Sequence, residues 1–341
     1  MSMRYSRQVL FKPIGSTGQE SLSKATVAII GCGALGSASA EMLVRAGIGT
    51  IHLADRDYVE MSNLQRQQLY TEEDAELKKP KVIAAAERLQ AIRADINLFT
   101  YIEHVDGRLM EQLASQCDVI VDATDNFETR LIINDAAYKY GIPWIYGACV
   151  GSSGSVFPFV PEQSASACFR CLLPVLPSVN ATCDTAGIIA PAVQITASYQ
   201  CAEVLKWLTG NKEAMRTKML HVDVWNSTQL EVGIARMKDE HCDTCGSHPV
   251  YPSLLGSRSN RDVVLCGRDT VQIMPDSDRA LSFDDAEQLA KRLRLHYKRT
   301  PYFVEIQVED KRIMLFHNGR MLIHGLNDAA AGRSLYHQLF G

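Results

Sequence analysis

Two pairs of cysteines have the spacing of metal ligands. The first pair lies in Cys168-Phe169-Arg170-Cys171 and the second in Cys242-Asp243-Thr244-Cys245, with residues 172–241 between them. One C-x-x-C pair alone is also typical of a redox dithiol, or arises by chance. Two such pairs supply four thiolates, which form a closed tetrahedral zinc site with no position for a substrate. The sequence therefore predicts a structural zinc ion. The nearby His241 and His248 are not needed as ligands.

A glycine-rich turn lies between an expected strand and an expected helix. Residues 31–36 (GCGALG) fit the pattern G-x-G-x-x-G through Gly31, Gly33 and Gly36. Glycines there permit a tight turn and let the backbone approach a ligand, while the N-terminus of the helix attracts phosphate. Asp55, at the end of the next strand, is placed to hydrogen-bond a ribose hydroxyl. The pattern alone fits NAD, FAD and ATP alike, or a turn that serves only packing.

A run of polar side chains favours ATP over a dinucleotide. Residues 55–67 (DRDYVEMSNLQRQ) follow the second strand, and residues 122–126 (DATDN) follow the fourth. A triphosphate needs cations and amide donors around its phosphates, and a carboxylate for Mg²⁺. The candidates are Asn63, Arg66 and Lys81 for the phosphates, Asp125 for Mg²⁺, and Asp57 in the same nucleotide site. The alternative is that Arg66 and Lys81 are ordinary surface charges.

Among the remaining cysteines, Cys183 is the candidate nucleophile. It lies in a loop before an expected helix, and a thiol near a helix N-terminus has a lowered pKa. The adjacent carboxylate of Asp184 would disfavour the thiolate, so a catalytic and a structural role both remain open. Cys266 is a second, weaker candidate. The apolar surroundings of four others are typical of core residues: Cys32, Cys117, Cys149 and Cys201.

An alternation of strands and helices must position these residues. Continuous apolar runs such as residues 26–31 and 117–122 are typical of strands that are covered on both faces, and helical patterns such as 81–93 lie between them. This order predicts an α/β fold with a doubly wound, Rossmann-like, mostly parallel sheet. An added antiparallel part is expected from strands at 155–160, 219–225 and 229–235.

The last part of the chain follows a different pattern. A linker at residues 251–260 is expected to end a first domain of residues 1–250. Residues 261–341 then predict strand, helix, strand, hairpin and helix in turn. This order indicates a separate small α+β domain, and nothing in its sequence indicates a role.

Five motifs in fixed order carry a family resemblance. They are RYSRQ (4–8), GCGALG (31–36), DRDYVEMSNLQRQ (55–67), Pro80-Lys81 and DATDN (122–126). Together they resemble the ThiF/MoeB family of ubiquitin-activating-type adenylating enzymes over roughly residues 4–250. The resemblance implies ATP-dependent adenylation of the C-terminal glycine carboxylate of a small ubiquitin-like sulfur-carrier protein, ThiS-like or MoaD-like. That step prepares a thiocarboxylate for thiamin or molybdopterin biosynthesis.

The resemblance also implies roles for individual residues. Asp55 would bind the ribose. Asn63, Arg66 and Lys81 would bind the phosphates, and Asp125 would bind the Mg²⁺. It implies a homodimer in which Arg7 reaches the partner's ATP site, and it supports zinc on the four cysteines. In parts of the family the cysteine that matches Cys183 links covalently to the carrier, and a persulfide is the expected sulfur donor. The C-terminal domain matches neither the short members nor the sulfurtransferase extension of others, so the sulfur source stays open.

Composition limits the other possibilities. The chain has 341 residues, of which 46% are hydrophobic, and a net charge of −4 that does not favour nucleic acid. Its start lacks a signal-peptide core and no apolar run is long enough to span a bilayer, so we expect a cytoplasmic enzyme. Three alternatives remain at this point: a nucleotide-dependent oxidoreductase, an enzyme that activates a tRNA base, and a scaffold that binds the carrier without catalysis.

Overall fold

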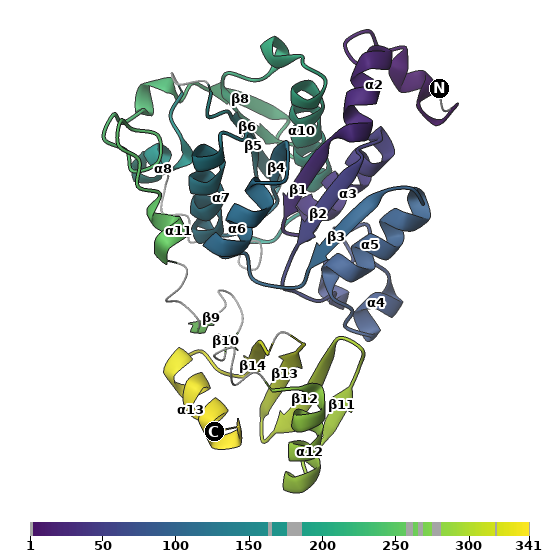
Figure 1. The fold of residues 1–341 in the computed structure, drawn as a ribbon, viewed down its shortest axis with the longest axis vertical. Helices are drawn as coiled ribbons and strands as arrows, with labels where there is room; N and C mark the ends of the chain where they lie inside the picture. The colour runs from purple at the N-terminus through teal and green to yellow at the C-terminus, as the bar shows by residue number, and fades with distance from the viewer. Residues whose placement is uncertain are drawn as a thin grey trace. The chain divides into compact units, whose positions relative to one another are not determined.

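The computed structural model in Figure 1 divides into two compact units, Met1–Ser257 and Arg258–Gly341. It describes residues 3–162, 166–175, 186–256, 262–264, 269–274, 281–317 and 319–340. Cys183 and Cys266 lie outside these residues.

The first unit is built on an eight-stranded sheet of order β3-β2-β1-β4-β5-β6-β7-β8. The parallel strands are β1 (Thr26–Ile30), β2 (Thr50–Ala54), β3 (Asn97–Tyr101), β4 (Val119–Asp122) and β5 (Trp144–Val150). The antiparallel strands are β6 (Ser153–Phe159), β7 (Met219–Asp223) and β8 (Thr228–Val232). The predicted mostly parallel sheet with an antiparallel part is confirmed. Its strand order reverses at β1, between β2 and β4, where such sheets bind ligands.

Helices cover both faces of this sheet (Figure 1). On one face, α3 (Ala34–Ala46), α5 (Lys81–Ile92) and α10 (Ala190–Leu208) share a hydrophobic core with β1 and β2, and α10 packs against α3, β5 and β6. On the other, α6 (Gly107–Ala114) and α7 (Phe127–Tyr140) pack against β4 and β5. The other described helices of the unit are η1 (Met3–Tyr5), α1 (Ser6–Val9), α2 (Gly15–Lys24), η2 (Met61–Asn63), α4 (Glu72–Glu76), α8 (Phe169–Leu172), η3 (Leu173–Val175), η4 (Lys212–Ala214), η5 (Ala235–Met237) and α11 (Pro252–Gly256).

The helix ends near the expected site follow from local sequence. Gly47 ends α3 in the left-handed conformation, with φ of 98°, which glycine adopts without steric cost. Asn126 begins α7, because its side-chain oxygen accepts a hydrogen bond from the Thr129 amide at 2.8 Å. The residue directly before this cap is Asp125, so the cap fixes the start of α7 beside the expected Mg²⁺ ligand.

The second unit is a six-stranded antiparallel sheet of order β11-β12-β13-β14-β10-β9. Its elements are β9 (Asp262–Val264), β10 (Thr270–Ile273), α12 (Phe283–Leu293), β11 (Tyr297–Arg299), β12 (Phe303–Val308), β13 (Lys311–Phe316), β14 (Met321–His324) and α13 (Ala329–Phe340). Apolar residues of four strands form its core with α12 and α13, including Val304, Ile313, Phe283 and Tyr336. This unit therefore has a hydrophobic core of its own.

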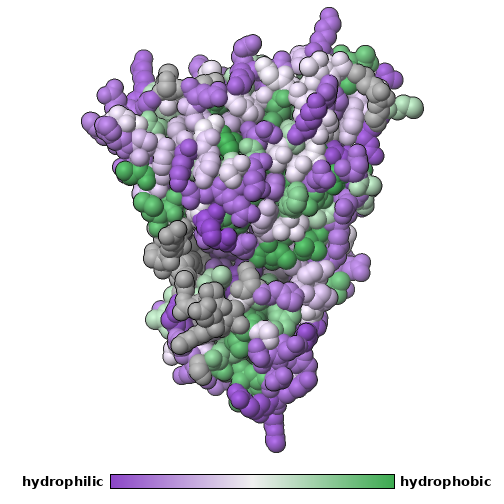
Figure 2. All heavy atoms as spheres, viewed as in Figure 1, coloured by the Kyte–Doolittle hydropathy of each residue, from purple (hydrophilic) through white to green (hydrophobic). Residues whose placement is uncertain are grey.

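The exposed residues in view are mainly hydrophilic. Figure 2 shows them over most of the visible face, with smaller hydrophobic areas among them. Within the residues that the structure describes, no helix has both the length and the apolar character needed to cross a bilayer.

Candidate active site

The glycine loop brings the start of α3 close to the ends of β1 and β4. Gly31 has φ of +94°, and a Cβ there would lie 2.5 Å from the carbonyl oxygen of Ala123. A Cβ on Gly36 would lie 1.9 Å from the carbonyl oxygen of Gly31. Only glycine fits at these two positions. A Cβ on Gly33 would meet little, since the nearest atom is Gln67 Nε2 at 3.9 Å, so this glycine keeps the N-terminus of α3 accessible to an anion.

Two side chains hold the peptide groups of Cys32 within this loop. Asp55 Oδ2 accepts a hydrogen bond from the Cys32 amide at 2.6 Å, and its Oδ1 accepts one from the Asp57 amide at 2.7 Å. The Tyr70 hydroxyl donates to the Cys32 carbonyl oxygen at 2.5 Å. Burial raises the pKa of Tyr70, so this donor stays protonated. Asp55 therefore positions the loop, and its remaining lone pairs can still accept a ribose hydroxyl.

Lys81 is buried beside Asp57. It begins α5 with only 4% of its surface exposed, and its Nζ lies 3.3 Å from Asp57 Oδ2. The Lys81 amide also donates to the Asp57 carbonyl oxygen at 2.9 Å. A lysine in such a place is not an ordinary surface charge, because burial of an ammonium requires a partner.

The other expected phosphate ligands lie around η2. Asn63 is buried, and its Oδ1 accepts from the Glu60 amide at 3.1 Å. Arg66 is partly exposed, and its Nη1 donates to the Ser62 carbonyl oxygen at 2.9 Å. Each side chain is thus oriented by a backbone contact within the same short segment.

Asp125 lies in the loop after β4. Its carboxylate is exposed, and Oδ1 accepts from Asn126 Nδ2 at 3.3 Å. The last residue of β1, Ile30, pairs with Ala54 of β2 and with Asp122 of β4. The loops after these strands, which hold Gly31, Asp55 and Asp125, therefore meet at one edge of the sheet. Arg7 lies exposed on α1, and within the described part of the chain no hydrogen bond or ion pair joins it to the other candidates.

Gln67 is a buried polar residue of this region whose role the sequence motifs did not indicate. It is buried, its Nε2 lies beside Gly33, and its Oε1 has no hydrogen-bond partner among the described residues. A buried amide oxygen without a partner is costly in a closed protein interior. Gln67 directly follows Arg66 in the sequence, and this position is the one feature of the motif that could have indicated a role in the site.

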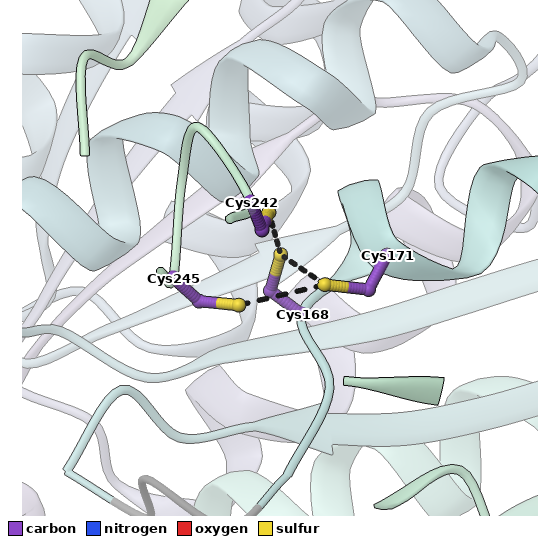
Figure 3. A group of neighbouring side chains, drawn as sticks. All are labelled: Cys168, Cys171, Cys242 and Cys245. Carbon is purple, nitrogen blue, oxygen red and sulfur yellow. Dashed lines mark hydrogen bonds between the residues drawn. The ribbon is translucent and has the colours of Figure 1, made fainter. Parts of the chain in front are cut away.

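The four cysteines form one cluster in the first unit (Figure 3). Their sulfur atoms all lie within 4.8 Å of one another. The Sγ–Sγ distances are 3.8 Å for Cys168–Cys171, 3.6 Å for Cys168–Cys242 and 3.5 Å for Cys171–Cys245. Tetrahedral zinc with Zn–S bonds of about 2.3 Å needs sulfurs about 3.8 Å apart. The donor set and its spacing therefore fit a four-thiolate metal ion.

A buried carboxylate on α7 holds the two cysteine segments together. Asp135 Oδ2 accepts from Arg170 Nη2 at 2.8 Å and from the Ser253 amide at 2.9 Å, and its Oδ1 accepts from the Thr244 hydroxyl. Arg170 and Thr244 lie inside the two C-x-x-C pairs and bond to each other, with Nε to Oγ1 at 2.9 Å. The neighbouring Asn134 Oδ1 accepts from the Phe169 amide at 3.0 Å. These contacts of α7 with the cluster were not foreseen from the sequence.

We expect Asp135→Ala to lower the free energy of unfolding by about 3 kcal/mol, because it removes the buried carboxylate that pairs with Arg170 and accepts from Thr244 and the Ser253 amide. Urea denaturation of the metal-loaded protein measures this change. The matched control is Asp243→Ala, which removes an exposed carboxylate next to Cys242 and should cost less than about 0.5 kcal/mol. Equal stability of the two variants would contradict the role of Asp135.

Comparison with known proteins identifies the family. The model of the ThiF family matches residues 5–245. The chain belongs to the ThiF family. The sulfur carrier protein ThiS adenylyltransferase of Bacillus subtilis is 48% identical over 344 residues, and the alignment covers 100% of both chains. The molybdopterin-synthase adenylyltransferase of Escherichia coli is 32% identical over 244 residues, which are 72% of this chain and 96% of that protein.

A solved structure agrees with the ThiF-family fold. The crystal structure of E. coli MccB with ATP superposes with a TM-score of 0.62 at 22% identity, covering 72% of this chain and 75% of that chain. At this identity the likeness concerns the fold alone. The Bacillus relative aligns over its whole length, so the region of the second unit also has a counterpart in that protein.

Proposed function

We propose that this protein is an ATP-dependent adenylyltransferase that activates the C-terminal carboxylate of a small sulfur-carrier protein. The observation that carries the proposal is the set of polar groups at one edge of the sheet in a ThiF-family chain, where the glycine loop, Asp55 and Asp125 meet. Full-length similarity to a ThiS adenylyltransferase supports the class of substrate. Carriers of thiamin and of molybdopterin biosynthesis are both candidates, since relatives with each name match.

Charge and position can account for the chemistry of this reaction. The carrier carboxylate is already ionised at neutral pH, so its attack on the α-phosphorus needs no general base. We assign Arg66, Lys81 and Asn63 to the triphosphate and Asp125 to Mg²⁺, which neutralises charge on the phosphates when bound. Asp55 orders the glycine loop and accepts a ribose hydroxyl. Catalysis then consists of positioning and electrostatic stabilisation.

We also propose that the protein is a homodimer and that it binds a structural zinc ion besides Mg²⁺. The four cysteines would hold a structural Zn²⁺, which suits a reducing compartment such as the cytoplasm. A homodimer would complete each ATP site with Arg7 of the partner subunit. The exposed position of Arg7 leaves its side chain available for that contact.

The decisive experiment is exchange of labelled pyrophosphate into ATP, with each candidate carrier protein added in turn. We expect exchange that requires both the carrier and Mg²⁺, and the carrier that gives the highest rate identifies the pathway. Exchange with no carrier at all, or tight binding of NAD in place of ATP, would overturn the proposal.

Cys183 is the candidate residue for sulfur transfer, the step that follows adenylation. We propose that this thiol accepts sulfur from a persulfide donor or captures the carrier, so Cys183→Ser should leave pyrophosphate exchange nearly unchanged. Thiocarboxylate formation should stop, because a serine hydroxyl is barely ionised at neutral pH and forms no persulfide or disulfide. Mass spectrometry of the carrier after incubation with ATP and a sulfur donor measures this. Full thiocarboxylate yield would make Cys183 structural, and Cys266→Ser would be examined next.

A further inference from the structure

A buried ion pair lies directly beneath the loop that carries Asp125. Arg130, the fourth residue of α7, places its Nε 3.0 Å from Oδ2 of Asp122, the last residue of β4. The Arg130 and Asp122 side chains are only 8% and 0% exposed. The two charges cancel, so the pair adds no net charge to the site. Its effect is to fix the positions of the groups that it contacts.

The pair holds every polar backbone group of Thr124. Arg130 Nη2 donates to the Thr124 carbonyl oxygen at 2.7 Å, while Asp122 Oδ1 accepts from the Thr124 amide at 2.9 Å and from its hydroxyl at 2.6 Å. Arg130 Nη2 also lies 3.2 Å from the Gly147 carbonyl oxygen in β5, and the guanidinium carbon lies 5.0 Å from the centre of the Tyr146 ring. The guanidinium thereby joins β4, β5 and α7 to one loop residue.

Thr124 precedes Asp125, so the peptide plane that joins them is the one whose oxygen Arg130 holds. We propose that Arg130 is a positioning residue, which fixes this peptide so that the Asp125 carboxylate is directed at the Mg²⁺ of a bound nucleotide. The inference rests on the proposed role of Asp125. It does not require the carrier protein, since every contact involved lies within this chain.

The test is the gain in nucleotide affinity that Mg²⁺ provides. Isothermal calorimetry with a non-hydrolysable ATP analogue gives the dissociation constant with and without Mg²⁺, and the ratio of the two is the gain. In Arg130→Met we expect this gain to fall about tenfold or more, because a carboxylate displaced by about 1 Å loses its geometry. Affinity without Mg²⁺ should change little. Thr124→Val, which removes only the hydroxyl contact with Asp122, should lower the gain in the same direction by a smaller factor.

Arg93→Met is the matched control. Arg93 is also buried and also donates to carbonyl oxygens, those of Val44 at 3.3 Å and Ile48 at 2.5 Å. Among the described residues, no hydrogen bond or ion pair joins it to the Asp125 loop. Its Mg²⁺ gain should equal that of the unmodified protein, with thermal melting reporting any loss of stability in each variant. An unchanged gain in folded Arg130→Met, or an equal loss in Arg93→Met, would overturn the inference. If Arg130→Met does not fold, an unchanged gain in Thr124→Val overturns it. The proposed function fails separately, if the unmodified enzyme shows no carrier-dependent exchange.

Discussion

Asp125→Ala is expected to abolish Mg²⁺-dependent pyrophosphate exchange, and Arg66→Ala to lower its rate by about a hundredfold or more. A preorganised electrostatic contact to a transition state is worth about 3 kcal/mol, which corresponds to such a factor. The exposed Asp125 carboxylate lies at the carboxyl edge of the parallel strands, and no ion pair within the described residues occupies it. Initial rates of exchange at saturating carrier, measured over a range of Mg²⁺ concentrations, give both effects.

Two neighbouring substitutions control for the loss of charge alone. Glu128→Ala removes an exposed carboxylate from the first turn of α7, three residues beyond Asp125. Arg88→Ala removes an exposed guanidinium from α5, the helix that Lys81 begins. Both should keep exchange within about twofold of the unmodified rate, because an exposed charge that is not a ligand of the nucleotide or the metal contributes little. A near-normal rate in Asp125→Ala or in Arg66→Ala would remove that residue from the site.

The parallel sheet could be predicted because its signals are local. Buried strands are continuous apolar runs, and the glycine turn needs no distant partner to be recognised. The strand predicted at 219–225 ends earlier, at Asp223, because of hydrogen bonds that the amino-acid composition does not reveal. The Asp223 side chain accepts hydrogen bonds from the amides of Trp225 and Asn226 at 2.9 and 3.1 Å, which turns the chain before Trp225. The strand predicted at 229–235 likewise ends at Val232.

Several contacts that hold the two sites could not be predicted, because they join residues far apart in the sequence. Asp135 and Thr244 are 109 residues apart, and Tyr70 and Cys32 are 38 apart. Asp122 and Arg130 are near in sequence, yet their pairing depends on β4 and α7 meeting at a buried point. Local patterns thus predicted which groups bind the ligand, and the folded chain adds the contacts that hold those groups in place.

Removal of the cysteine ligands is expected to affect the whole first unit rather than the chemistry alone. The cluster joins the segment after β6 to the end of the unit, and Asp135 ties both to α7, whose first turn follows Asp125. Because a structural zinc ion contributes to folding, we expect about one zinc per chain and a large loss of stability when it is absent. Elemental analysis of protein purified without added metal, together with thermal melting, measures both.

The Cys168→Ser, Cys242→Ser double variant decides which residues bind the ion. These are the two buried ligands, one from each pair, and a serine hydroxyl is a poor substitute for a thiolate at neutral pH. Zinc content should therefore fall to near zero and the melting temperature should drop. Cys201→Ser is the matched control, since its buried Sγ lies 3.7 Å from the Ser39 carbonyl oxygen, to which a serine hydroxyl can also donate. Zinc that stays stoichiometric in the double variant would show that other residues bind the metal. Zinc lost without any loss of stability would instead leave the cluster a metal site on which the fold does not depend.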